Sequence, residues 1–230
     1  MHFDKPKPIH SWRDFLKEVG TIVVGVCIAL TAEQIVEAAH WKHKVREVEA
    51  SLHKELAEDN GPQAVERLRI FHCVDVELDR LERGLLDSRD QGAPFRTAKL
   101  IAPAFHSWDA DAWRVAVASD VTSHMPTPRM YSWSQAYALI PHLDQVAQRE
   151  AHSWARLRVV EVAPARPSAA QIEDRLQAIA EARGDNALLK TMSETFLQNI
   201  VKAGVQMTDV QQRILLPRDL ARWPGCYFTR

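Results

Sequence analysis

Residues 19–32 read VGTIVVGVCIALTA and carry no charged side chain, which constrains the fold more than any other stretch of the chain. A basic, proline-containing leader, MHFDKPKPIHSWRDFLK, precedes the apolar segment, and a charged helical pattern follows it. This order is typical of a signal anchor, a single membrane helix that carries a soluble domain. We therefore predict a membrane-anchored protein.

The uncharged run alone is short for a membrane span. As a helix it covers about 21 Å, whereas the hydrocarbon core of a bilayer is about 30 Å thick. Apolar residues extend the run at both ends, and Trp12 and Trp41 bracket it, about 43 Å apart along a helix, where aromatic belts lie. We predict a leader at residues 1–14 and an anchor helix at 15–40 in the lipid bilayer.

The alternative is a secreted helical protein whose signal is removed. Cleavage after Ala32 would put Leu30 at a position that needs a small residue, and cleavage after Ala38 is the only tolerable choice. The basic residues on the two sides of the anchor nearly balance, so the orientation rests on the short leader. Signal anchors leave such a leader in the cytoplasm, and we expect residues 42–230 on the other side.

The composition indicates what kind of domain follows the anchor helix. The 29 Lys and Arg residues balance 30 Asp and Glu residues, and no basic stripe indicates nucleic-acid binding. Hydrophobic residues make up 46% and charged residues 26%, as in a folded domain. Apolar residues recur every three to four positions, which predicts an all-α fold in which the anchor helix continues into an antiparallel bundle.

The breaks in this pattern set the expected elements of a bundle over residues 41–216. Asn60-Gly61-Pro62 is a strong turn signal, Pro141 predicts a kink, and Ser168 with Gln171 has the spacing of a capping box. We predict a hairpin at 41–90, an irregular part at 91–127 with a short helix near 109–119, helices at 128–160, 168–183 and 186–216, and a tail at 217–230.

Few side chains have the spacing of a reactive site. Glu37, His40 and His43 follow at three-residue steps, and Glu-x-x-His is half of a di-metal carboxylate pattern, but the chain has no second copy. We expect solvated residues near the membrane surface, with a metal-dependent membrane enzyme as the rival hypothesis. The sequence has no glycine-rich phosphate loop, nucleophile elbow or paired-cysteine zinc motif. We therefore expect no enzyme, cofactor or metal.

Cysteine and tryptophan each leave two alternatives open. Cys73 and Cys226 either form a disulfide, if the domain is exported, or stay reduced. The tryptophans either line a ligand pocket or anchor the core, and the second role is the commoner one. The tryptophans concerned are Trp108, Trp113, Trp133, Trp154 and Trp223.

The anchor has one sharper feature. Thr21, Gly25 and Ala29 recur every four residues, a small-residue stripe that lets helix backbones approach closely, and Glu33 continues it. The alternative is that small residues fall there by chance and Glu33 reaches the membrane surface. We expect the protein to self-associate as a homo-oligomer through this stripe.

Residues 12–60 resemble an uncharacterised family of bacterial single-pass membrane proteins. Its members open with E-x-x-x-I-V-x-G-x-x-I-A-L, and a charged helix then ends near L-x-x-E-L-x-x-D/N. The matching positions are Glu18, Ile22, Val23, Gly25, Ile28, Ala29, Leu30, Leu52, Glu55, Leu56, Asp59 and Asn60. Residues 113–137 resemble the family's tryptophan-led helix and the tyrosine-containing helix after it, whereas Gln34–His40 departs from the Asn and Trp that the family carries there.

This resemblance implies a protein of the bacterial inner membrane and carries over no activity. With the orientation inferred above, it puts the domain in the periplasm. From the sequence we expect a membrane-anchored helical bundle that acts as a binding, scaffolding or sensing module for an unknown ligand or partner.

Overall fold

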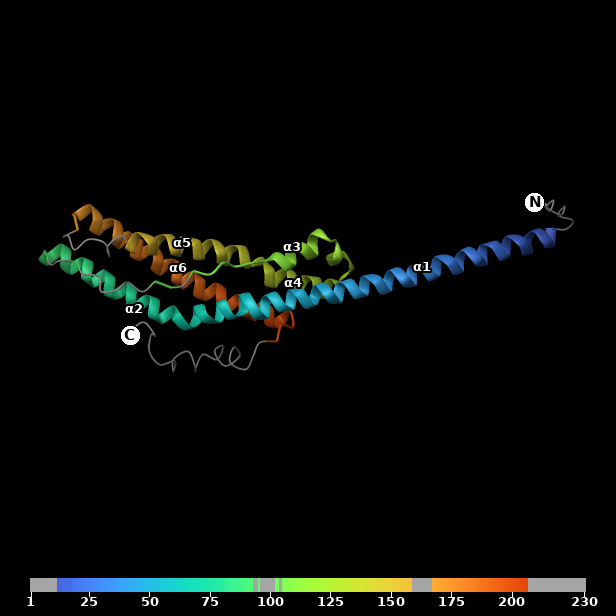
Figure 1. The fold of residues 1–230 in the computed structure, drawn as a ribbon, viewed down its shortest axis with the longest axis horizontal. Helices are drawn as coiled ribbons and strands as arrows, with labels where there is room; N and C mark the ends of the chain where they lie inside the picture. The colour runs from blue at the N-terminus through green and yellow to red at the C-terminus, as the bar shows by residue number, and fades with distance from the viewer. Residues whose placement is uncertain (1–11, 93–94, 96–101, 104, 159–166, 207–230) are drawn as a thin grey trace, which may run out of the picture. The chain divides into compact units, whose positions relative to one another are not determined.

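The computed structural model describes residues 12–92, 95, 102–103, 105–158 and 167–206 of the chain (Figure 1). Over these residues the chain is helical and contains no strand, which confirms the predicted all-α class. The elements are α1 (Trp12–Lys54), η1 (Glu55–Asn60), α2 (Gly61–Gln91), α3 (Asp111–Ala118), η2 (Val121–His124), α4 (Thr127–Ala138), α5 (Ile140–Arg158) and α6 (Ala169–Lys202).

Residues 1–47 and 48–230 form two compact units, which are described separately. In the first unit, α1 exposes its large apolar side chains, among them Ile22, Ile28 and Ile35. Burying one such side chain is worth about 1.5–3 kcal/mol, so a run of them is costly in water. The helix is long and apolar enough to cross a membrane.

The second unit begins within α1, and the helix continues through η1 into α2. The predicted break at Asn60-Gly61-Pro62 and the hairpin built on it are wrong. Asn60 (φ −71°, ψ −37°) and Gly61 (φ −62°, ψ −51°) both keep right-handed helical angles. η1 is a π-helical turn, in which the Gly61 N–H donates to the carbonyl of Leu56, five residues earlier. This wider turn accommodates Pro62, which has no N–H to give to an α-helical ladder.

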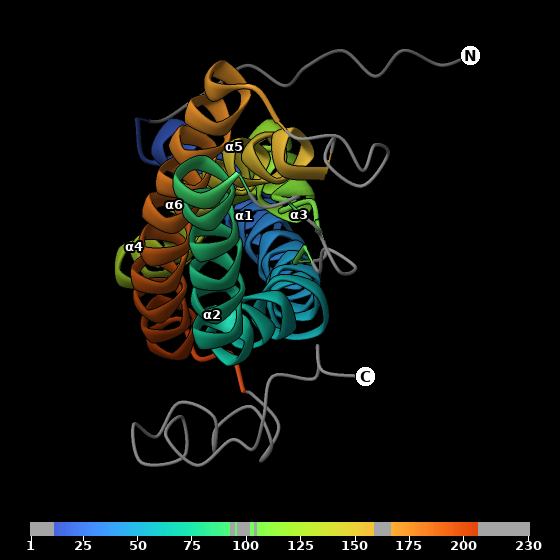
Figure 2. The ribbon, with the colours of Figure 1, turned by 90° about the vertical axis from the view of Figure 1, so that its left-hand side faces the viewer.

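Helices α2, α5 and α6 form the body of the second unit, with α6 packed against both of the others (Figure 2). Their apolar stripes meet in one core, because residues three or four apart lie on one face of a helix. This core contains Val74, Leu78, Leu81, Leu85, Phe95, Trp154, Leu157, Ile172, Ala178, Ile179 and Ala182. Toward η1 the fully buried side chains are Leu52, Leu56, Trp133, Phe196 and Ile200.

Two further boundaries differ from the prediction, and one local prediction is confirmed. Pro141 divides the expected helix at 128–160 into α4 and α5, since its ring removes a backbone donor. Gly184 does not end a helix, because the buried Asp185 and Asn186 hold α6 to its neighbours. The predicted capping box is present: Ser168 Oγ accepts from the Gln171 N–H, and Gln171 accepts from the Ser168 N–H.

The end of α6 also differs from the predicted helix at 186–216. The helix ends at Lys202, and Gly204 then adopts a left-handed conformation with φ 85°. The rest of the predicted last turns and the tail at 217–230 lie outside the described residues, as does the leader before Trp12.

Two glycine substitutions test the π-helical turn. A Cβ atom on Gly61 would lie 2.6 Å from the Leu56 carbonyl oxygen, so Gly61→Ala should lower the free energy of unfolding by about 1–3 kcal/mol. A Cβ on Gly184 meets nothing within 4 Å, so Gly184→Ala should raise it by about 0.5–1 kcal/mol. Urea unfolding of the detergent-solubilised protein, followed by circular dichroism, measures both. If Gly61→Ala is as stable as Gly184→Ala, the turn does not have this geometry.

Candidate functional site

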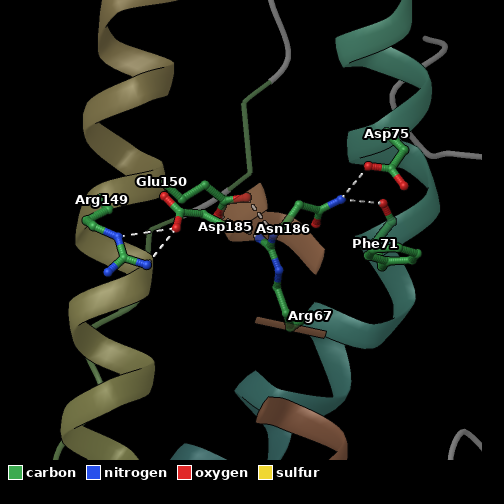
Figure 3. Close-up of polar contacts among 7 residues, drawn as sticks. All are labelled: Arg67, Phe71, Asp75, Arg149, Glu150, Asp185 and Asn186. Carbon is green, nitrogen blue, oxygen red and sulfur yellow. Dashed lines mark hydrogen bonds and ion pairs between the residues drawn. The ribbon is translucent and has the colours of Figure 1, made fainter. Parts of the chain in front are cut away.

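A buried ion pair joins α2 to α5 at the middle of the second unit (Figure 3). The guanidinium of Arg67 donates to both carboxylate oxygens of Glu150, through Nη1 at 2.8 Å and through Nη2. Arg67 is 7% exposed and Glu150 is 4% exposed. Removing two charges from water is expensive, and paired geometry of this kind offsets the cost.

Asn186 brings α6 into the same network. Its side-chain oxygen accepts from Arg67 Nη2, and its nitrogen donates to the Phe71 carbonyl at 3.1 Å and to Asp75 Oδ1 at 2.8 Å. Asn186 is fully buried, so these bonds replace those it would make with water. This amide joins α6 to α2, and Arg67 extends the network to Glu150 on α5 (Figure 3).

A second ion pair is formed by the residues that precede Glu150 on α5 and Asn186 on α6. Arg149 on α5 donates to Asp185 Oδ1 on α6 at 2.8 Å. Arg149 is about half exposed, and this pair is therefore worth less than the buried one. The first pair joins α5 to α2, and this second pair joins α5 to α6.

Burial raises the pKa of Glu150 above its usual value, although the Arg67 guanidinium opposes this. The indole of Trp154 also favours the charged carboxylate, without making a hydrogen bond of standard geometry. Desolvation therefore outweighs pairing at this site.

A cavity of about 530 Å³ lies over this ion pair. Arg67 and Glu150 contribute to its lining, and α5 supplies a shelf of small side chains one helical turn apart, Ala147, Ala151 and Ala155. Aromatic walls come from Trp154 and from the segment that precedes α3. The cavity is of the size that holds small molecules in proteins.

The segment before α3 supplies Phe105, His106 and Trp108 to the cavity. Trp108 is buried and packs edge-to-face on Phe196, with ring centroids 5.9 Å apart. At the rim, His106 Nε2 lies 3.5 Å from Glu66 Oε2. One wall is therefore aromatic, and the opening is polar.

This wall is hydrogen-bonded to the π-helical turn. The Asn60 side chain donates to the Asp109 carbonyl at 2.8 Å, and the Ala112 N–H donates to Glu55 Oε2 at 2.9 Å. Both acceptors and donors are partly buried, so the bonds are shielded from water. These two bonds connect the segment beside the cavity to η1.

The metal hypothesis for Glu37, His40 and His43 gains no support. All three are exposed on α1, and His43 Nε2 lies 3.2 Å from Glu47 rather than beside another of the three. Among the described residues, no three His, Cys, Asp or Glu side chains are placed to hold a metal ion.

The stripe of Thr21, Gly25, Ala29 and Glu33 is exposed on α1. Thr21 Oγ1 donates to the Lys17 carbonyl at 2.9 Å, and a Cβ on Gly25 would meet nothing within 4 Å. Self-association through this stripe stays a prediction.

The tryptophans divide between the two roles left open. Trp108 and Trp154 line the cavity, and Trp133 is buried in the core. Trp113 stacks on Tyr137, with ring centroids 5.5 Å apart. Trp223 lies outside the described residues.

The cysteines differ in state. Cys27 is free and exposed on α1, and Cys73 on α2 is disulfide-bonded. Cys226 lies outside the described residues.

Sequence reasoning missed the buried network, although the sequence carried a signal for it. On α5, Glu150 stands four residues after Val146 and four before Trp154, on the buried stripe. Asn186 occupies the same kind of position between Ala182 and Leu189 on α6. A polar residue on an apolar stripe is the mark of a buried polar network.

No protein-family model, curated protein or solved structure matches this chain. The resemblance of residues 12–60 to the single-pass membrane family therefore stays a prediction.

Replacing one partner of the buried ion pair should lower the free energy of unfolding more than replacing both partners. Arg67→Met and Glu150→Leu should each cost about 3–5 kcal/mol, because each leaves an unpaired buried charge. The double variant should be more stable than either single variant. Arg114→Met removes an exposed ion pair with Asp111 and serves as a control with little effect. Urea unfolding measures all four, and additive single effects would contradict the pairing.

The same pair predicts a pH dependence. A carboxyl whose pKa is higher in the folded than in the unfolded protein stabilises the fold at pH values below its unfolded-state pKa. This stabilisation is lost as the pH rises through the folded-state pKa. Without the Arg67 cation, the pKa of Glu150 rises further. The cost of Arg67→Met should therefore shrink as pH falls from about 7 to about 5. An equal cost at both pH values would show that Glu150 is not the group left uncompensated.

Proposed function

We propose that this protein is a membrane-anchored binding module that senses a small molecule in the cavity of its helical domain. The observation that carries the proposal is the cavity itself, walled by two tryptophans and an alanine shelf over a buried ion pair. Binding is favoured over catalysis because the ionisable groups at the floor, Arg67 and Glu150, are bonded to each other.

The sensing part of the proposal rests on the bonds between the cavity wall and η1. A ligand that packs on Trp108 and Phe105 stabilises one position of the wall, and Asn60 and Glu55 hold that wall to the π-helical turn. π-Helical turns are frequent at functional hinges. The helix that contains this turn continues into the apolar segment of α1.

Photolabelling of the full chain in lipid nanodiscs tests the cavity. An apolar phenyl diazirine should label peptides that cover Phe105–Trp108 and Ala147–Ala155, in addition to the membrane helix. Ala151→Trp fills the shelf and should reduce labelling of the cavity peptides at least fivefold. Labelling of α1 should stay unchanged and provides an internal standard.

Ala187→Trp is the matched control, because Ala187 is exposed on α6 and does not line the cavity. Cavity labelling should survive this substitution. Cavity peptides that are unlabelled in wild type, or labelled equally in Ala151→Trp, would contradict the proposal.

We also propose that the helical domain lies outside the cytoplasm, in the periplasm of a bacterium. The disulfide at Cys73 supports this, since disulfides persist in oxidising compartments. A C-terminal alkaline phosphatase fusion should be active, and the corresponding fluorescent-protein fusion should be dark. The reverse result would place the domain in the cytoplasm.

A further inference from the structure

The polar groups of the cavity select against charged ligands. Arg67 and Glu150 neutralise each other at the floor, and Glu66 and His106 form a pair at the rim. Arg158 also lines the cavity, but it is exposed, so water screens its charge. An anion drawn to Arg67 also meets the carboxylate of Glu150, and a cation drawn to Glu150 meets the guanidinium. Either ion would lose its hydration without gaining a free partner.

The apolar lining accounts for most of a ligand's surface. Ala147, Ala151 and Ala155 form a flat shelf, and Phe105, Trp108 and Trp154 offer aromatic faces. A hydrocarbon chain or ring that packs on these alanines excludes water from its own surface and from the alanine side chains. The body of the ligand is therefore hydrocarbon.

Gln63 supplies a polar group that the fold does not use. It lines the cavity, one helical turn before Arg67 on the same face of α2. Its Oε1 atom is buried and has no hydrogen-bond partner among the described residues. Turning this side chain toward the cavity therefore breaks no bond of Oε1. Its amide then offers one acceptor and two donors to a ligand.

We propose that the cavity binds neutral amphiphiles that carry a carboxamide on an alkyl or aryl body, and that Gln63 pairs with that amide. This inference rests on the proposed binding function and adds the chemical class of the ligand. An amide is the group that donates to Gln63 Oε1 and accepts from Gln63 Nε2 at once. It carries no charge, as the balanced floor requires.

A matched series of eight-carbon compounds tests the class. Octanamide, octanoate, octylammonium and octane differ in the head group and share the same chain. Each competes with the diazirine for the cavity of the full chain in nanodiscs, at equal free aqueous concentration. Labelling of α1 reports any displacement from the bilayer. Octanamide should compete at least tenfold better than the two ions and better than octane.

Gln63→Met keeps the size of the side chain and removes its amide. In this variant the advantage of octanamide over octane should fall about tenfold, and competition by octane should not change. Gln177→Met is the matched control, because Gln177 is exposed on α6 and does not line the cavity, and it should keep the wild-type preference.

The outcomes separate the two proposals. Displacement of the probe by all four compounds alike, or best by an ion, overturns the amide class and leaves the binding site standing. An unchanged preference in Gln63→Met overturns the role of Gln63. Failure of every compound to displace the probe, together with cavity peptides that are never labelled, overturns the binding function itself.

Discussion

The hydrogen bonds between Arg67, Glu150 and Asn186 join three helices at one buried point. Each of these residues is costly to bury alone, and Arg67 offsets part of that cost by bonding to both Glu150 and Asn186. Burial still raises the pKa of Glu150, because desolvation outweighs the effect of the Arg67 cation. A shift of any one helix along its axis would leave a charge or an amide without its partner. Apolar stripes alone tolerate such shifts more easily.

The position of the cavity follows from this constraint. The long side chains of Arg67 and Glu150 link α2 to α5, and α5 carries alanines rather than large residues next to Glu150. Small side chains leave space that the core elsewhere fills with leucine. The segment before α3 closes that space with aromatic rings, and its bonds to Asn60 and Glu55 connect the closure to the π-helical turn.

Local signals in the sequence predicted the class of the fold, and longer-range effects decided the rest. The apolar run of residues 19–32, the helical spacing and the capping box at Ser168 were readable because each depends on near neighbours. The continuation of the helix through Gly61 and Pro62 could not be predicted in this way, because it depends on a π-helical turn that accommodates the proline. The predicted break between the helices at 168–183 and 186–216 is absent, and the buried Asn186 lies within a continuous α6, hydrogen-bonded to α2. The network was missed because a single polar position does not reveal which distant residue faces it.

Hydrogen exchange of the full chain in nanodiscs, with and without octanamide, tests the central claim most directly. If ligand binding in the cavity is transmitted through the wall to η1, octanamide should slow amide exchange in Phe105–Ala118 and in Glu55–Asn60 together. This protection should occur in wild type and be absent in Ala151→Trp. Protection limited to α1, or protection of the wall without any change in η1, would contradict it.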